Sequence, residues 1–303
     1  MKVSLLVPAY NERENVEPLL RTFSRFIKER DLDWELVLID DGSTDGTYEA
    51  AERLKSRFPF LKLFRHKRNY GKSEALLTGA RAASGDVVVI YDADMQFTLA
   101  DAQRLVELLE KENLDIVAGR KRGKYEKKFV STIYNTLSRL LFKIPVHDMN
   151  AMKALRREIL LKIPMRKDWH RYIIPLAHDM GYRIGEADVK LLPRKYGKSK
   201  YSNPFRIFIG FFDLVAVKFQ LTFMRKPMLF FGSLGLVSLF LGLVVGLIAL
   251  YLRYVRGIGY RPLLYLVILF VLAGLILFTM GLLGELIAGL YDRLEKLEKG
   301  GQK

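Results

Sequence analysis

Hydrophobic residues in the first 119 positions switch between two kinds of spacing. Short continuous apolar runs, typical of buried strands, lie at residues 3–7, 35–39, 61–64 and 86–91. Segments with apolar residues at helical spacing separate them, at residues 15–28, 47–58 and 73–83. The alternation predicts an α/β domain with a mainly parallel sheet, whose ligands bind beyond the carboxyl ends of the strands.

The pattern changes after Gly119. An apolar stripe between Phe129 and Leu141 predicts an amphipathic helix. Residues 205–224 are rich in Phe, Leu, Ile and Val, and a polar residue recurs every seventh position, at Arg206, Asp213 and Gln220. A helix of this kind suits the membrane interface, and an ordinary core helix is the alternative.

Two long uncharged runs dominate the last part of the chain: the 26 residues Pro227–Leu252 and the 23 residues Pro262–Gly284. About 20 apolar residues are enough for a helix to cross the hydrocarbon core of a bilayer. Both runs therefore predict transmembrane helices, and they argue against a wholly soluble protein. We expect an α/β domain at 1–202, an amphipathic interface region at 203–226, and a two-helix membrane anchor with a short tail at 227–303.

Two crossings place the flanking parts of the chain on the same side of the membrane. Met1 to Pro8 lacks the basic region and long apolar stretch of a signal peptide. We therefore expect an integral protein of the cell membrane whose α/β domain is cytoplasmic.

Charge is divided unevenly along the chain. Of the formal net charge of +16, residues 120–206 alone carry +15, from 22 basic and 7 acidic side chains. Such a block is typical of a surface that binds phosphates, whether of nucleic acid, lipid headgroups or a phosphorylated substrate. Its position before two spans favours the lipid interpretation, and no nucleic-acid-binding motif accompanies it. The absence of cysteine excludes a disulfide scaffold.

Asp92 and Asp94 are the sharpest chemical feature of the sequence. They follow directly after the buried run 86–91, so both lie at the carboxyl end of a predicted strand. Two such carboxylates can converge on a hard divalent cation such as Mg²⁺ or Mn²⁺, which would neutralise a departing diphosphate. A solvated turn is the alternative.

Asp40 and Asp41 follow another predicted strand in the same way. Their carboxylates suit the N–H groups of a base or the hydroxyls of a ribose. A capped turn before the next helix explains the same residues equally well, because Asp, Ser, Thr and Gly favour such positions.

Several motifs together resemble family 2 glycosyltransferases with the GT-A fold. They are Pro8-Ala9-Tyr10-Asn11-Glu12, Asp40-Asp41-Gly42-Ser43-Thr44-Asp45-Gly46, Asn69-Tyr70-Gly71-Lys72 and Asp92-Ala93-Asp94-Met95-Gln96. Further motifs resemble the polyprenyl-phosphate branch, which includes dolichyl-phosphate mannose and glucose synthases and undecaprenyl-phosphate sugar transferases. These are Gly119-Arg120, His147-Asp148-Met149-Asn150 and the segment from Pro193 to Tyr201. The implied fold is a Rossmann-like GT-A domain followed by interface helices and two transmembrane helices.

The resemblance implies a role for each matching residue. It implies a nucleotide-sugar pocket at Pro8, Tyr10, Glu12, Asp41, Lys72 and Asp92. It implies a Mg²⁺ or Mn²⁺ site at Asp94 and Gln96, and a catalytic set of Asp92, Asp94, Gln96 and Asp148. It implies phosphate and acceptor contacts at Arg120, Arg194, Lys198 and Lys200. His170 and Arg171, ahead of an apolar helix, are candidates for the sugar pocket, with simple packing as the alternative.

The implied reaction moves a sugar, with inversion, from a donor such as GDP-mannose or UDP-glucose to dolichyl or undecaprenyl phosphate at the cytoplasmic membrane face. A phosphomonoester has a second pKa near 6, so the acceptor needs no strong base at pH 7. We therefore expect Asp148 to orient the acceptor rather than to remove a proton. The acceptor loop lacks the glycine that mannose synthases carry after the acidic residue, so the exact sugar does not transfer.

Two other functions stay open. A processive polysaccharide synthase typically carries a Gln-x-x-Arg-Trp motif, which the sequence lacks. A catalytically inactive nucleotide-sugar-binding membrane protein is disfavoured by the intact acidic clusters. The expected partners are a nucleotide-diphosphate sugar, a polyprenyl phosphate and the bilayer, with no nucleic acid; a homo-oligomer is neither required nor excluded.

Overall fold

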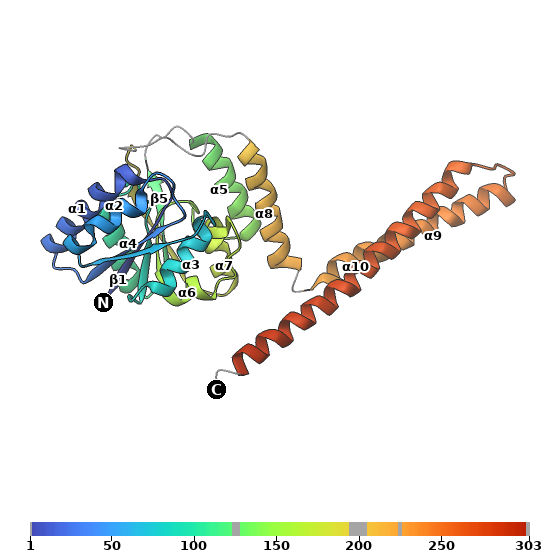
Figure 1. The fold of residues 1–303 in the computed structure, drawn as a ribbon. Helices are drawn as coiled ribbons and strands as arrows, with labels where there is room; N and C mark the ends of the chain where they lie inside the picture. The colour runs from blue at the N-terminus through green and yellow to red at the C-terminus, as the bar shows by residue number, and fades with distance from the viewer. Residues whose placement is uncertain (1, 123–127, 194–204, 224–225, 301–303) are drawn as a thin grey trace. The chain divides into compact units, whose positions relative to one another are not determined.

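The computed structural model describes residues 2–122, 128–193, 205–223 and 226–300 (Figure 1). The chain forms two compact units, Met1–Phe211 and Phe212–Lys303. The finer division expected above, at 202 and 226, stays a prediction.

Seven strands and most of the helices belong to the first unit. The strands are β1 (Val3–Ala9), β2 (Trp34–Asp40), β3 (Leu61–Arg65), β4 (Val87–Ile90), β5 (Ile116–Arg122), β6 (Lys153–Arg156) and β7 (Ile184–Lys190). The helices are α1 (Arg13–Glu29), α2 (Thr47–Leu54), α3 (Lys72–Ala82), α4 (Leu99–Lys111), α5 (Lys128–Phe142), α6 (Arg157–Lys162) and α7 (Ile173–Asp179). Short 3-10 helices follow α2 (η1, Lys55–Arg57) and precede α7 (η2, Trp169–Tyr172). The helix predicted at 47–58 is therefore shorter: the α-helix ends at Leu54, and its last turn is the 3-10 helix η1.

The strands form one sheet in the order β3-β2-β1-β4-β6-β5-β7. All neighbours run parallel except β6, which is antiparallel to both β4 and β5. In the register, Lys153 at the start of β6 lies opposite Ile90 near the end of β4 and Ala118 of β5. The reversal of β6 brings the residues before it to the edge where the parallel strands end. The expected mainly parallel α/β architecture is confirmed.

Helices cover both faces of the sheet. Apolar residues of α1 and α4 pack with alternate strand residues such as Leu5, Val89 and Ala154 into the main core. Helix α3 packs on β1 and β2 at the opposite face. There a Cβ on Gly79 would lie 2.8 Å from Ile39 Cδ1, so glycine allows the close approach of helix and sheet.

Glu35 at the start of β2 organises the edge of the sheet opposite the strand ends. Its carboxylate accepts hydrogen bonds from Ser4 Oγ (2.6 Å) and Ser84 N (2.7 Å), and it pairs with Lys62 Nζ at 3.0 Å. Burial alone would raise the pKa of Glu35, but these donors outweigh burial and lower its pKa to about 2.

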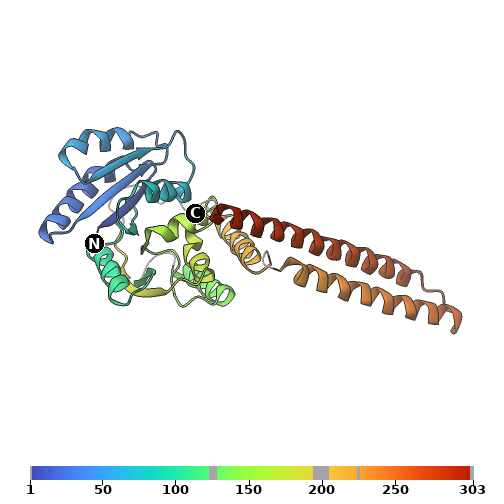
Figure 2. The same ribbon diagram turned by 90° about the horizontal axis from the view of Figure 1, so that it is seen from below.

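The second unit contains two helices that are long and apolar enough to cross a membrane, over Met228–Tyr254 and Arg261–Leu290. The first span joins a π-helical turn (η3, Met228–Gly232) to α9 (Ser233–Tyr254), and the second lies in α10 (Arg261–Gly300). Figure 2 shows α9 and α10 side by side as a hairpin. A Cβ on Gly235 would lie 2.8 Å from the carbonyl oxygen of Gly274, so small residues bring the two backbones together.

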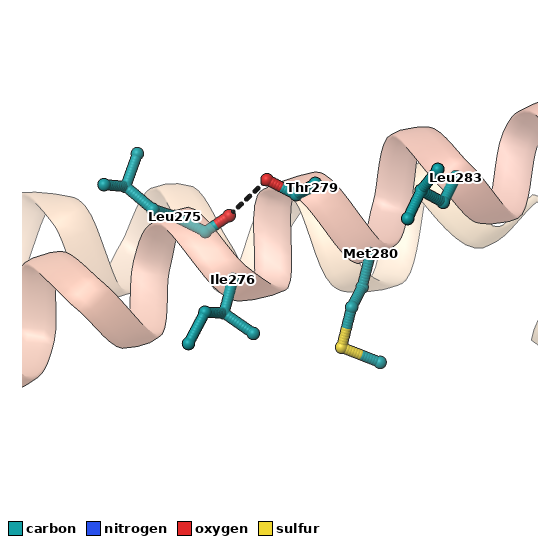
Figure 3. A pocket seen from close by; sticks show the side chains of 5 residues that line it. All are labelled: Leu275, Ile276, Thr279, Met280 and Leu283. Atoms are coloured by element: carbon teal, nitrogen blue, oxygen red, sulfur yellow. Dashed lines mark hydrogen bonds between the residues drawn. The ribbon is translucent and has the colours of Figure 1, made fainter.

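Helix α10 carries a shallow apolar hollow of about 300 Å³ on its surface (Figure 3). Its lining is Leu275, Ile276, Thr279, Met280 and Leu283. The hydroxyl of Thr279 donates to the carbonyl of Leu275 at 2.8 Å, which leaves the hollow without a free polar group. A surface of this composition suits contact with lipid chains rather than with a charged substrate.

Helix α8 (Phe205–Phe223) confirms the helix expected at 205–224. Leu214 and Val217 are buried, while Phe212 and Val215 are exposed. The placement of α8 in the membrane interface stays a prediction.

Candidate active site

The carboxyl ends of β1, β2 and β4 and the start of β6 carry most of the residues expected to act. Asp41 follows β2, Asp92 and Asp94 follow β4, and Asp148 precedes β6. Parallel strands end at the same edge, and the antiparallel β6 begins there. The topology therefore gathers four carboxylates that are up to 107 residues apart in the chain.

Asp41 is 3% exposed and is held by three donors. The N–H groups of Tyr70 and Gly71 donate to its two oxygens at 2.9 and 2.8 Å, and His66 Nδ1 lies 2.7 Å from Oδ1. His66 in turn contacts Thr78 Oγ1 at 2.9 Å. Since each carboxylate oxygen accepts about two hydrogen bonds, the described residues leave Oδ2 one acceptor position for a ligand N–H or hydroxyl.

A hollow of about 370 Å³ adjoins Asp41. Its lining is His66, Tyr70, Glu74 and Lys167. The ring of Tyr70 meets the ring of His66 edge-on at 5.4 Å, and Arg68 lies over the Tyr70 ring. Two aromatic rings beside a carboxylate with a spare acceptor position are chemically suited to a nucleoside.

The end of β1 and the residues just after it include Pro8, Tyr10 and Glu12. Tyr10 is 36% exposed and Pro8 is half-buried. The N–H of Glu12 donates to Thr47 Oγ1 at 2.9 Å, and its carboxylate accepts from Asn15 at 2.6 Å. Glu12 thus joins the loops after β1 and β2 to one another.

Asp92 forms an ion pair with Lys72 at the start of α3. Burial alone would raise the pKa of Asp92, but the charges of Lys72, Lys153 and Lys121 outweigh that effect and lower it. The carboxylate is therefore ionised at neutral pH. The pair connects two predicted site residues that lie 20 positions apart in the chain.

Asp94 and Gln96 flank a tight turn. Met95 between them has φ of 53°, in the left-handed region that residues with a side chain seldom adopt. The N–H of Gln96 donates to Asp94 Oδ1 at 3.3 Å, and Asp94 is 7% exposed. Gln96 also holds Leu192 through two hydrogen bonds, one from Leu192 N to its carbonyl (2.8 Å) and one from its Nε2 to the Leu192 carbonyl (3.4 Å).

This donor set fits a hard divalent cation. Asp94 would supply carboxylate oxygens and Gln96 its side-chain amide oxygen, because the amide nitrogen of Gln96 bonds Leu192. Within the described ranges no group of three or more His, Cys, Asp or Glu side chains forms a metal cage. Mg²⁺ and Mn²⁺ accept one or two protein carboxylates and take further oxygens from phosphates and water, so a closed cage is not required.

Asp148 lies 3% exposed ahead of β6. Lys121 Nζ of β5 is 3.5 Å from its Oδ2, and the N–H of Asn150 donates to its Oδ1 at 2.9 Å. Glu186 of β7 accepts from the N–H of Asp148 at 3.2 Å and lies 2.7 Å from His147 Nδ1. Asp148 is therefore held in place, with Lys121 as its counter-ion.

Lys121 and Lys153 were not among the predicted site residues. Lys153 is 4% exposed, and burial and the nearby charges of Lys72 and Lys121 lower its pKa to about 7, against the opposing effect of Asp148 and Asp92. In the sequence it is one of 22 basic side chains between residues 120 and 206, so nothing there distinguishes it from a surface lysine.

His170 is joined to the start of α3. Its N–H donates to Ser73 Oγ at 3.0 Å, and its Nδ1 lies 3.3 Å from the same oxygen. Burial first, and then the charges of Lys72, Arg171 and Lys153, lower the pKa of His170 well below 6.5. A neutral imidazole thus lies beside the lysines of the site.

The remaining predicted residues divide into two groups. Arg120 lies half-buried in β5, opposite Asp188 of β7, and Arg171 lies in η2 beside His170. Arg194, Lys198 and Lys200 lie outside the described residues. The roles of all the predicted site residues stay predictions.

Comparison with known proteins identifies the family of the chain. Residues 4–164 match the family model of glycosyl transferase family 2. A dodecaprenyl-phosphate galacturonate synthase of Rhizobium johnstonii is 33% identical over 97% of this chain and 89% of its own length. The chain belongs to glycosyl transferase family 2.

Two further matches place this glycosyltransferase within the family and confirm its fold. An undecaprenyl-phosphate 4-deoxy-4-formamido-L-arabinose transferase of Proteus mirabilis is 29% identical over 96% of this chain and 90% of its own length. Glucosyl-3-phosphoglycerate synthase of Mycobacterium tuberculosis, solved with Mn²⁺, UDP and phosphoglyceric acid, superposes with a TM-score of 0.57. That match has 21% identity and covers 73% of this chain and 78% of the other, and it bears on the fold alone. The resemblance to the polyprenyl-phosphate branch is thereby confirmed.

Proposed function

We propose that this glycosyltransferase transfers a sugar from a nucleotide-diphosphate sugar to a polyprenyl phosphate at the cytoplasmic membrane face. The observation that carries the proposal is the gathering of Asp41, Asp92, Asp94 and Asp148 at one edge of the sheet. Two helices long enough to span a bilayer agree with a lipid acceptor. The two relatives named above, which act on prenyl phosphates by their names, support the same acceptor class.

The donor would lie across the ends of β1, β2 and β4. Asp41 and the hollow beside it would hold the nucleoside, and Lys72 would accompany the diphosphate next to Asp92. A Mg²⁺ or Mn²⁺ ion held by Asp94 and Gln96 would supply charge neutralisation for the leaving diphosphate. Gln96 also fixes Leu192, which immediately precedes the basic segment that contains Arg194, Lys198 and Lys200.

The acceptor would enter beside Asp148 and Arg120. An oxygen of the lipid phosphate attacks C1 of the sugar, the new C1–O bond forms opposite the leaving group, and the nucleoside diphosphate departs with the electrons of the old bond. The configuration at C1 inverts. Since a phosphomonoester is mostly dianionic at pH 7, no side chain has to remove a proton. Asp148, fixed by Lys121 and by the N–H of Asn150, would orient the acceptor.

The proposal is tested by transfer to a lipid. Detergent-purified protein, Mg²⁺ or Mn²⁺, a polyprenyl phosphate and a panel of UDP- and GDP-sugars are combined, and lipid products are identified by mass spectrometry. We expect a polyprenyl-phosphate sugar with inverted configuration. Asp94→Asn should abolish it, whereas Asp86→Asn, an exposed carboxylate at the other end of β4, should leave it unchanged. Nucleotide binding without transfer from any donor would contradict the proposal.

A further inference from the structure

We infer that Glu186 of β7 is a positioning residue for the acceptor: its carboxylate fixes residues 146–150, the acceptor segment, so that Asp148 meets the phosphate of the polyprenyl phosphate. The inference rests on the proposed function and adds a residue to its acceptor side. It follows from the hydrogen bonds of Glu186, from the way the rest of the acceptor segment is held, and from the position of Glu186 in the sheet.

Glu186 binds the acceptor segment through three contacts. Its Oε1 accepts hydrogen bonds from the backbone N–H groups of His147 (2.5 Å) and Asp148 (3.2 Å), and its Oε2 lies 2.7 Å from His147 Nδ1. The side chain of Glu186 is 14% exposed. A carboxylate that accepts from two consecutive N–H groups fixes the orientation of both peptide groups.

The acceptor segment lies outside helices and strands, between the end of α5 and the start of β6. Val146 and Met149, each 1% exposed, anchor it to the interior on either side of the two bonded peptide groups. In the part of the chain that the structure describes, the hydrogen bonds of the backbone N–H groups of His147 and Asp148 go to Glu186. The conformation between the two apolar anchors therefore depends on this one side chain.

Asp148 is held from two neighbouring strands. Glu186 of β7 binds its backbone N–H, while Lys121 Nζ of β5 lies 3.5 Å from its Oδ2. Lys121 thus holds the carboxylate, and Glu186 holds the backbone from which the side chain extends. Loss of Glu186 releases the backbone while the ion pair with Lys121 remains.

Glu186 also projects from the face of the sheet that carries Arg120. In the register of β5 and β7, Ala118 lies opposite Glu186 and Arg120 lies opposite Asp188. Residues opposite one another in a sheet share a face, and so do residues two apart along a strand. The acceptor segment therefore joins β7 on the face of Arg120, the other residue proposed to meet the acceptor.

Glu186 acts through the acceptor segment rather than on the substrate. A carboxylate repels the phosphate of the acceptor, and both oxygens of Glu186 already bind His147 or Asp148. Its removal should therefore change the use of the acceptor. The donor, proposed to lie across the ends of β1, β2 and β4, should bind as before.

The variant Glu186→Ala tests the inference. At saturating donor, kcat/KM for the polyprenyl phosphate should fall by about 10- to 100-fold, the effect of losing hydrogen bonds to a charged group. The Kd of the donor's nucleoside diphosphate with Mg²⁺, measured by calorimetry without lipid, should change less than about threefold, because that site makes no contact with Glu186. Glu158→Ala removes an exposed carboxylate of α6 that pairs with Lys162, and it should leave both values unchanged.

Glu186→Gln separates the backbone contacts from the charge. Its amide oxygen can still accept from the N–H groups of His147 and Asp148, so kcat/KM for the acceptor should fall by less than about fivefold. A glutamine variant as impaired as the alanine variant would overturn the inference, because it would assign the effect to the charge of Glu186. Tryptophan fluorescence melting verifies that each variant is folded.

The outcomes separate this inference from the proposed function. An unchanged kcat/KM for the acceptor in Glu186→Ala, or an equally large loss of affinity for the nucleoside diphosphate, would overturn the inference and leave the proposed function intact. Absence of transfer by the wild type from every donor would overturn the proposed function. Native mass spectrometry of polyprenyl phosphate binding in detergent would then decide the inference: equal binding by wild type and Glu186→Ala would overturn it, and weaker binding by the variant would support it.

Discussion

Replacing Lys153 by methionine should make the protein more stable. Burial and neighbouring lysines lower the pKa of Lys153 from 10.5 to about 7. At about 1.36 kcal/mol per pKa unit, the protonated lysine is about 5 kcal/mol less favourable in the folded chain than in the unfolded chain. Loss of the hydrogen bond to Ala151 offsets about 1 kcal/mol of this. We expect a net gain of about 4 kcal/mol below pH 7.

The gain should depend on pH with a defined sign. Between pH 7 and 10.5 the unfolded chain retains the proton of Lys153 and the folded chain releases it, so the wild type gains stability as pH rises. The advantage of Lys153→Met should therefore shrink by about 1.4 kcal/mol per pH unit above pH 7. Titrations of the other groups largely cancel in the difference between the two proteins.

Melting curves followed by tryptophan fluorescence measure the effect. Both tryptophans, Trp34 and Trp169, lie buried in the first unit, so the signal reports on that unit rather than on the spans. For a unit of this size, about 4 kcal/mol corresponds to roughly 8–16 °C in Tm. A variant that melts below the wild type at pH 6, or a difference that does not change between pH 6 and 9, would refute the reasoning.

Three other changes have defined outcomes. Glu35→Gln should lower the free energy of unfolding by about 3 kcal/mol at pH 7, because the pKa of Glu35 is about 2 in the folded chain. This stability is present above pH 4.5 and is lost as pH falls through about 2. Urea unfolding between about pH 2 and 7 should therefore show a stability that depends less on pH in the variant than in the wild type. Gly235→Leu should separate the hairpin of α9 and α10, since a Cβ would already lie 2.7 Å from a backbone nitrogen. Disulfide crosslinking between one cysteine introduced into each helix should fall, and an unchanged yield would contradict the packing. Asp94→Ala should lower kcat by at least about 100-fold with Mg²⁺ present, and wild-type activity would remove Asp94 from the site.

The sequence predicted those features that depend on local pattern. The apolar runs at 3–7, 35–39 and 86–91 are strands, and the two uncharged runs are long apolar helices, because each pattern meets its structural requirement within one segment. Asp92 and Asp94 were found because they follow a buried strand directly.

The features that it could not predict depend on pairing between distant segments. Nothing local shows that β6 runs antiparallel between β4 and β5, and only this reversal brings Asp148 and Lys153 to the edge where Asp92 lies. The pair Lys72–Asp92 likewise requires α3 to pack beside the end of β4. Lys153 resembles any surface lysine until its strand neighbours are known.

The most direct test of the account is transfer of a sugar to a polyprenyl phosphate by detergent-purified protein with Mg²⁺ or Mn²⁺. The lipid fraction is analysed by mass spectrometry after incubation with paired UDP-uronates and UDP-hexoses, and with GDP-mannose for comparison. The account predicts a polyprenyl-phosphate sugar that disappears with Asp94→Asn and persists with Asp86→Asn. Release of nucleotide without any glycolipid, from every donor, would contradict it.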